Sequence, residues 1–210
     1  MFDLDGTLTW HDTLVPYLAA ALAARPRRLW RLWPLPAIVA RFLVDRDHGR
    51  IKSRLIRAVL GGLGRDELGR LTRAFLDARL AGLIRPAALA ALAQHRARGD
   101  WLVLLSASTD LYVREIGTRL GFDEVICTEV RWRDGRLDGA LASPNRRGAE
   151  KSRCLAALRA RHPGAQLAAY ANARSDLEHL AGADAPLLVN GSRRARRAAR
   201  ALGIPAADWD

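Results

Sequence analysis

Two aspartates stand two residues apart at the start of the chain, in the segment Phe2-Asp3-Leu4-Asp5-Gly6-Thr7. Residues i and i+2 of an extended strand point to the same side. Asp3 and Asp5 can therefore face one pocket if the backbone bends at Gly6, where no Cβ obstructs a turn. One carboxylate can attack a phosphorus atom while the other handles a proton. The pair predicts a phosphoryl-transfer site at the exit of a buried strand.

The chain divides into two regions by the period of its apolar residues. Residues 10 to 85 show helical spacing interrupted by Pro and Gly, which predicts an insert of about four helices. From residue 86 onward, helices alternate with short apolar strands. We expect helices at 86–98, 111–120, 149–160, 176–181 and 192–202, strands at 101–105, 124–130, 166–170 and 186–189, and a tight hairpin around Asp134-Gly135.

This alternation predicts the α/β class, with a Rossmann-like parallel sheet covered by helices on both faces. Residues 1–12 and 86–210 would form this core, and residues 13–85 a helical cap. Sites in such sheets lie beyond the carboxyl ends of the strands. Asp3, Ser106 and Asn172 each follow a predicted strand, so we expect three distant segments to meet in one crevice. Only Met1 and Phe2 precede Asp3, so either the true start lies upstream or the central strand is very short.

Composition narrows the class of protein. Half of the 210 residues are hydrophobic, which indicates a globular chain. The two cysteines show no metal-ligand spacing and suggest a reducing compartment. No apolar run is long enough to span a membrane, and the N-terminus carries no secretory pattern. We therefore expect a cytoplasmic protein that contacts membranes only peripherally, if at all.

The net charge of +12 comes from an arginine-rich composition in which only Lys52 and Lys151 are lysines. A GC-rich coding sequence is one explanation, and attraction to lipid surfaces or phosphorylated substrates is another. A lysine kept in such a chain is expected to provide a compact ammonium that the planar guanidinium cannot replace. Lys52 is expected either to reach a second anionic group of a substrate or to lie on a solvated face.

Four segments together resemble the motifs of the haloacid dehalogenase-like (HAD) hydrolases, in the family's order. They are Phe2 to Thr9, then Leu102 to Ser108, Gly148-Ala-Glu-Lys151, and Tyr170 to Leu177. The helical insert directly after the first motif is similar to the C1 cap of subclass IB, which the phosphoserine phosphatases typify. The resemblance implies a magnesium-dependent phosphomonoesterase that works through an aspartyl-phosphate.

The resemblance also implies a role for each motif residue. Asp3 would be the nucleophile, Asp5 the acid and base, and Lys151 the balancing cation. Phosphate would be bound by Ser106, with Ser108 as a rival for that role, by the Ala107 N–H and by Thr7. The Mg²⁺ ligands would be Asp3, the Asp5 carbonyl, Asn172 and Asp176. Asp176 has a second reading as a helix N-cap.

Two positions leave alternatives open. Asp12 resembles the acidic residue that meets a substrate's amine, but it can also cap the helix that begins near Leu14. Asn172 stands where the family usually has an aspartate, so it offers Mg²⁺ an oxygen without a charge. A weakened HAD-fold protein that only binds phosphorylated ligands is therefore the alternative function.

The substrate class stays open at this level. A small phosphorylated metabolite such as phosphoserine and a lipid phosphate are both compatible with the motifs. Trp30, Trp33 and neighbouring arginines form a mixture seen in helices that lie in a membrane interface, although a packed pair of cap helices with an arginine rim explains the same pattern. Despite the arginine-rich C-terminal helix, we do not expect nucleic acid to be the partner.

Overall fold

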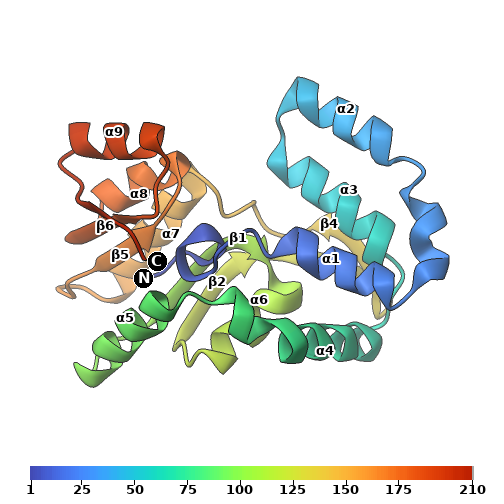
Figure 1. Cartoon of the computed structure of the whole chain (residues 1–210), viewed down its shortest axis with the longest axis horizontal. Coiled ribbons are helices and arrows are strands. Elements are labelled where there is room, and N and C mark those ends of the chain that lie inside the picture. The colour runs from blue at the N-terminus through green and yellow to red at the C-terminus, as the bar shows by residue number, and fades with distance from the viewer. Residues whose placement is uncertain (210) are drawn as a thin grey trace.

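The computed structural model describes residues 1–209 and has a parallel sheet with helices around it (Figure 1). The sheet strands are β1 (Val103–Thr109), β2 (Glu124–Thr128), β5 (Ala168–Ala171), β6 (Ala185–Val189) and β7 (Ala206–Ala207). Parallel pairing joins β2 to β1, and joins β5 to β6 and β6 to β7. The N-terminal residues lie between these two groups, because Phe2 bridges in parallel to both Leu104 and Tyr170.

The first three residues act as the central strand despite their small number. The Phe2 N–H donates to the Val103 carbonyl at 2.8 Å, and the Phe2 carbonyl accepts from the Leu105 N–H at 2.8 Å. On the other side, the Asp3 N–H donates to the Tyr170 carbonyl at 2.9 Å. Hydrogen bonds to both neighbours place Asp3 at the carboxyl end of the sheet's middle.

Alternate residues of β1 supply two hydrophobic clusters, one on each face of the sheet. Leu104 belongs to a cluster with Tyr112 and Ile116 of α6 (Asp110–Arg119). Val103 and Leu105 belong to a second cluster, with residues of α7 (Ala149–Arg161) and α8 (Leu177–Ala181). The α/β class with helices on both faces is confirmed. The remaining core helices are α5 (Pro86–Ala97) and α9 (Arg193–Ala201).

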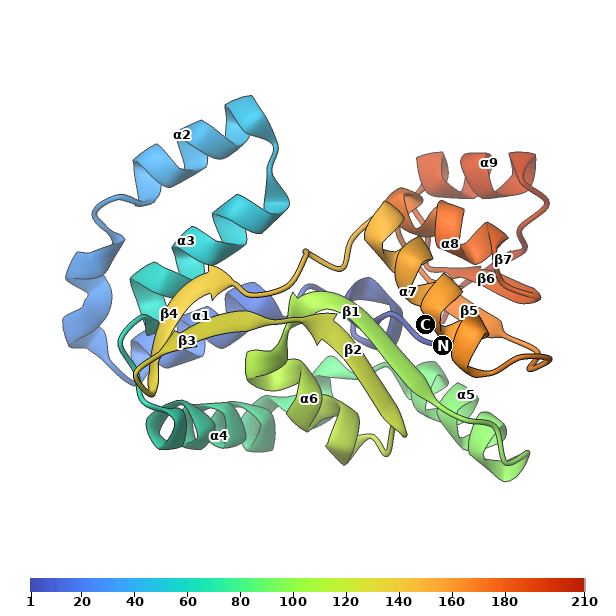
Figure 2. The same ribbon diagram turned by 180° about the vertical axis from the view of Figure 1, so that it is seen from behind.

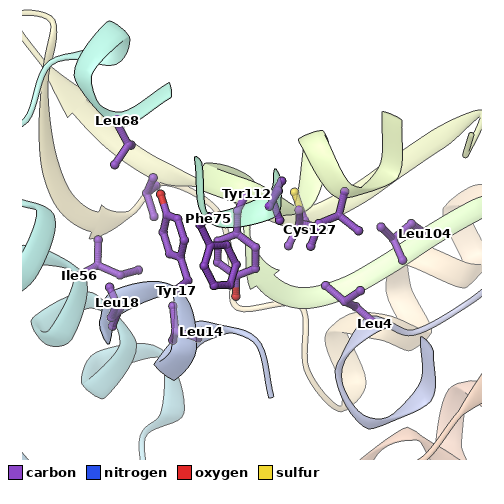
Figure 3. Close-up of a cluster of buried hydrophobic side chains, with 14 of the residues drawn as sticks. Leu4, Leu14, Tyr17, Leu18, Ile56, Leu68, Phe75, Leu104, Tyr112 and Cys127 are labelled. Carbon is purple, nitrogen blue, oxygen red and sulfur yellow. The ribbon is translucent and has the colours of Figure 1, made fainter. Parts of the chain in front are cut away.

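The insert after the first motif is helical, as its apolar spacing predicts. It comprises α1 (Leu14–Ala23), the 3₁₀ segment η2 (Pro26–Leu32), α2 (Leu35–Asp45), α3 (His48–Leu60) and α4 (Arg65–Leu83). Figure 3 shows Tyr17 of α1 beside Phe75 and Tyr112, and its ring centroid lies 4.6 Å from that of Tyr112. One hydrophobic cluster thus joins the insert to the sheet. The boundaries of a separate cap at 13–85 stay a prediction.

The predicted hairpin consists of β3 (Val130–Arg133) and β4 (Arg136–Leu141), which pair antiparallel. Asp134 and Gly135 at its turn have φ angles of 47° and 72°, the positive values of a tight two-residue turn. Figure 2 shows the hairpin running from the sheet to the helical insert. There β4 packs so closely on α3 that a Cβ at Gly139 would lie 2.8 Å from the Arg57 backbone.

Some boundaries differ from the sequence prediction. The first long strand begins at Val103 and continues through polar residues to Thr109, so that Ser106 lies within it. The expected strand 124–130 ends at Thr128, and Val130 starts the hairpin. Apolar content marks a strand only where apolar side chains pack in the core, and three of the four residues at 106–109 carry hydroxyl groups. The two-residue strand β7 is too short for any periodic signal.

Candidate active site

A cavity of about 540 Å³ lies at the carboxyl end of the central strands, beside the insert. Three of the four motifs contribute lining side chains at the carboxyl edge of the sheet, and Lys151 contributes from the first turn of α7. The predicted site residues that line it are Asp3, Asp5, Asp12, Lys52, Ala107, Ser108, Lys151, Asn172 and Asp176. Thr7 and Ser106 are fully buried and are absent from the lining.

Lys151 joins two carboxylates at the base of this cavity. Its Nζ lies 2.8 Å from Asp3 Oδ1 and 3.1 Å from Asp176 Oδ1. All three side chains are less than one-tenth exposed, so water screens their charges little. The ammonium therefore holds the Asp3 carboxylate in place and offsets part of the negative charge.

Burial sets the proton affinities of this group. Loss of solvation raises the pKa of Asp3 to about 7, against the opposing effect of Lys151. Burial by itself would lower the pKa of Lys151. The combined effect of the Asp3 and Asp176 carboxylates is larger, so the pKa of Lys151 lies above its usual range. The lysine is thus charged near neutral pH, and Asp3 lies close to its own titration point until a further cation approaches.

Asp5 is held by three donors at the entry to the insert. The Thr13 N–H and hydroxyl donate to Asp5 Oδ1 at 2.8 and 2.7 Å, and the Ser108 hydroxyl donates to Asp5 Oδ2 at 2.6 Å. Burial, with a smaller effect of Asp12, raises the pKa of Asp5 despite these hydrogen bonds. A carboxyl group with a raised pKa is suited to carry a proton near neutrality. Thr13 is a positioning residue that the motifs did not reveal.

The loop after Asp3 is one wide turn, Leu4–Leu8 (η1), closed by a hydrogen bond of 3.0 Å from the Thr9 N–H to the Leu4 carbonyl. Gly6 in this turn has φ 76°, in the left-handed region that favours glycine. This turn directs Asp5 away from the sheet toward Thr13. The bend expected at Gly6 is therefore present.

Asp12 behaves as a helix cap in this structure. Its Oδ1 accepts from the Leu14 N–H at 2.9 Å, at the start of α1. The alternative of capping near Leu14 is therefore confirmed, while Asp12 also lines the cavity. Asp176 precedes α8, but its side chain does not cap that helix and instead accepts from the Ala173 N–H at 3.3 Å.

The second motif presents a different hydroxyl from the one expected. Ser106 Oγ is buried and accepts from the Ser108 N–H at 3.0 Å. Ser108 and Ala107 line the cavity, so Ser108, the rival candidate, is the serine at its wall. The Thr7 hydroxyl is buried with no hydrogen-bond partner among the described residues. The phosphate-binding roles of Ser106 and Thr7 stay predictions.

Lys52 reaches the cavity from α3, and the alternative of a solvated face is wrong. Only 9% of this residue is exposed, because it lies on the buried face of α3. Its Nζ donates to Asn145 Oδ1 at 2.8 Å and to the Ala107 carbonyl. Burial lowers the pKa of Lys52 to about 8. A second ammonium thus stands beside the phosphate-binding motif.

The side chains around Asp3 offer the kind of donor that a hard divalent cation needs. Asp3, Asp176 and Asn172 all line the cavity and carry side-chain oxygen atoms, and oxygen is the donor that Mg²⁺ prefers. Asn172 packs on the η1 turn so closely that a Cβ at Gly6 would lie 2.1 Å from its Nδ2. Within residues 1–209, no three Asp, Glu, His or Cys side chains gather as a metal site. The site therefore fits Mg²⁺ by donor type, with one charge fewer than three carboxylates would give.

Several lining residues were not predicted from the sequence. They are Trp10, His11, Leu14, Val15, His48, Ile51, Leu55, Asn145 and Arg147, with Gly6 and Ala173 from the motifs' own loops. Asn145 and Arg147 belong to the segment between β4 and α7. Their only sequence signal is the Pro144-Asn145 loop pattern, which marks a turn without marking a ligand.

Comparison with known proteins agrees with this geometry. The family described as haloacid dehalogenase-like hydrolase matches residues 1–181. The Caulobacter vibrioides protein CicA is 36% identical over 189 residues, covering 87% of this chain and 82% of CicA.

Solved structures share the fold at lower identity. A Bordetella pertussis protein of unknown function matches with a TM-score of 0.79 at 22% identity, over 100% of this chain and 97% of that one. A phosphoserine phosphatase, solved as a phospho-aspartyl intermediate analogue, matches with a TM-score of 0.64 at 15% identity, over 93% and 88%. By the match of its sequence to the family over most of its length, this chain is a haloacid dehalogenase-like hydrolase.

Proposed function

We propose that this hydrolase is a magnesium-dependent phosphomonoesterase that acts through an aspartyl-phosphate on Asp3. One observation carries the proposal: the Asp3 carboxylate, 2.8 Å from Lys151 Nζ, faces a cavity that Asp5 and Ser108 also line. Phosphoryl transfer needs a positioned nucleophile, an acid and positive charge around the phosphate. Those groups meet here.

In the first step, a carboxylate oxygen of Asp3 forms a bond to phosphorus while the bond to the ester oxygen breaks. Asp5 donates its proton to the leaving alkoxide. In the second step, Asp5 takes a proton from water, whose oxygen attacks the phosphorus and releases Asp3 and inorganic phosphate. Lys151 stays near the nucleophile throughout and stabilises the charge on the phosphoryl oxygens.

Mg²⁺ would be held by the Asp3 carboxylate, the Asp5 main-chain carbonyl, Asn172 and Asp176. When bound, it supplies the positive charge that lets an anionic carboxylate approach a dianionic phosphate. Ala107 and Ser108 at the cavity wall would bind phosphate oxygens, with Ser106 behind them.

The alternative function is a weakened protein that binds phosphorylated ligands without turning them over. Asn172 favours it, because a neutral amide holds a hard cation less tightly than a carboxylate. The buried Lys151 and Lys52 would still attract a phosphate in such a protein.

The choice between a small metabolite and a lipid phosphate depends on the insert. Between residues 29 and 44, six large apolar side chains are at least 42% exposed: Leu29, Trp30, Trp33, Val39, Leu43 and Val44. We name these six the apolar patch. Such a patch beside arginines fits the interface of an anionic membrane.

Peripheral membrane contact and a lipid phosphate substrate follow as the finer proposal, at the cytoplasmic face. The apolar patch ends at Val44, four residues before His48, which lines the cavity. In this proposal, a lipid held at the patch reaches the site with its head group. No helix among residues 1–209 has the length and apolar character to cross a bilayer.

The experiment measures phosphate release from p-nitrophenyl phosphate, phosphoserine and phosphatidic acid in vesicles, each with Mg²⁺. The wild-type protein, Asp3→Asn and Asn172→Asp are compared. Turnover that Asp3→Asn abolishes supports the phosphatase. Turnover that appears only after Asn172→Asp supports the weakened binding protein, and turnover that survives Asp3→Asn overturns the proposed nucleophile.

A further inference from the structure

A second cavity, of about 790 Å³, adjoins the catalytic one on the side of α3. Its walls are one face of α3, the end of β4 and the segment 143–147. His48, Asn145 and Arg147 line both cavities, so the two share part of their walls. We name the second cavity the arginine groove. The arginine groove is therefore the space beside the shared residues toward which a ligand in the catalytic cavity would extend.

The sequence of α3 explains why arginines face this groove. Arg50, Arg54 and Arg57 recur at helical spacing, and side chains four and three residues apart lie on one face. The core-facing residues of the same helix, such as Ile56 and Val59, lie on another face. The groove therefore receives three arginines from one helix.

The arginine groove has more positive charge than its own acids balance. Five arginines line it, Arg46, Arg50, Arg54, Arg57 and Arg147, against one acid, Asp47. Two of them have partners: Arg50 Nη1 lies 2.7 Å from Asp45 Oδ2, and Arg57 Nη2 lies 3.2 Å from Asp138 Oδ1. In residues 1–209, the side chains of Arg46, Arg54 and Arg147 form no ion pair or hydrogen bond. Three guanidinium groups are thus available to a ligand.

The positive charge continues from the groove to the phosphate-binding motif. Asn145, shared by both cavities, accepts from Lys52 Nζ at 2.8 Å. Lys52 in turn donates to the Ala107 carbonyl, beside the predicted phosphate position. Arg147 is near enough to act on the charge of Lys52. Lys52 and Arg147 therefore place positive charge where the two cavities meet, and Arg54 adds to it in the groove.

We infer that the arginine groove binds a second phosphate group of the substrate, while the first phosphate is hydrolysed at Asp3. This inference rests on the proposed phosphatase function. A guanidinium group binds a phosphate through two parallel charge-assisted hydrogen bonds, so Arg54 and Arg147 suit a phosphate or phosphodiester. The substrate class is a phosphomonoester whose alcohol part carries another phosphate, in a soluble bisphosphate or in a lipid head group.

The first test compares two soluble probes that differ only in the second phosphate, butane-1,4-diol bisphosphate and butyl phosphate. Calorimetric binding to the Asp3→Asn protein avoids turnover. We expect the bisphosphate to bind at least about tenfold more tightly, and the double variant Arg54→Ala/Arg147→Ala to lose this ratio. Arg54→Lys/Arg147→Lys keeps the charge and should restore part of it.

Arg79→Ala serves as the matched control, because Arg79 is an exposed arginine of α4 outside both cavities. Equal affinity for the two probes overturns the inference, as does an equal loss in Arg79→Ala, which would indicate net charge alone. This binding test does not depend on hydrolysis. An absence of turnover would therefore contradict the phosphatase proposal, while the binding ratio would still decide whether the groove binds a second phosphate.

A second measurement separates the two sources of the phosphate. Hydrolysis is followed in vesicles that carry either phosphatidic acid, with one phosphate, or phosphatidylinositol 4-phosphate, with a phosphodiester and a phosphomonoester. A preference for the second lipid that depends on Arg54 and Arg147 supports a head-group substrate. A preference found only with the soluble bisphosphate supports a soluble one, and no preference in either form overturns the inference.

Discussion

Lys151 Nζ lies between two buried carboxylates, 2.8 Å from Asp3 Oδ1 and 3.1 Å from Asp176 Oδ1. One cation thus serves both the first and the fourth motif. Removing it would leave two negative charges facing each other in a site from which water is largely excluded. The ion pairs at this lysine therefore connect the stability of the fold to the chemistry of the site.

We expect Lys151→Met to lower the free energy of unfolding by about 3 to 5 kcal/mol in chelator, because it leaves buried charges uncompensated. Chemical denaturation of the variant and the wild type measures the loss. Adding Asp176→Asn to the variant should recover part of it. A loss below about 1 kcal/mol would mean that the pair is no stronger than a surface salt bridge.

Asn172→Asp should strengthen Mg²⁺ binding by about tenfold, because it adds a negative charge without changing side-chain shape. Calorimetric titration with Mg²⁺ gives the affinity independently of activity. Asn145→Asp is the matched control, since it makes the same charge change at another residue of the cavity lining. An equal gain in both variants would show a general effect of charge, contrary to a role for Asn172 as a ligand.

Lys52 should give activity an alkaline limit. Burial lowers its pKa from 10.5 to about 8, so the free protein loses this cation above about pH 8, and kcat/KM for p-nitrophenyl phosphate should fall there. Lys52→Arg, which stays charged, should remove the limit. An unchanged limit in Lys52→Arg would assign it to another group.

The same lysine should affect stability in the opposite direction. Between about pH 8 and 10.5 the unfolded chain binds more protons at Lys52 than the folded protein does. The free energy of unfolding therefore rises with pH through this window, as the cost of burying the ammonium disappears. Lys52→Met should flatten this rise in denaturation curves, and an unchanged slope would contradict the burial of a charged Lys52.

Trp30→Ala/Trp33→Ala should reduce partitioning onto phosphatidylglycerol vesicles by at least about tenfold, because each exposed indole would bury apolar area in the interface. Trp30 and Trp33 are 71% and 78% exposed. Co-sedimentation measures the bound fraction. Trp101→Ala is the control, because Trp101 is 60% exposed but lies outside the insert. Equal losses in both variants, or no loss in either, would argue against a membrane-binding patch.

Periodicity and motif order, which are local properties, account for most of what the sequence predicted. The alternation after residue 86 predicted the parallel sheet with two helical layers, and the Asp134-Gly135 pair predicted the hairpin, because strand alternation and turn geometry depend on neighbouring residues. The motifs indicated the family and nine of the twenty residues that line the cavity. The predicted strand boundaries were wrong where polar residues are buried in a strand, as in the segment from Ser106 to Thr109.

At several residues the sequence left two roles open, and only the tertiary structure decided between them. Asp12 caps α1, Ser108 rather than Ser106 lines the cavity, and Lys52 is buried. The last two outcomes depend on how segments from elsewhere in the chain pack around these residues. The arginine groove likewise needs α3 and the segment after β4 side by side, although they are about ninety residues apart. The sequence by itself determined the elements and the chemistry of the motifs, whereas long-range packing determined burial, partners and charge around them.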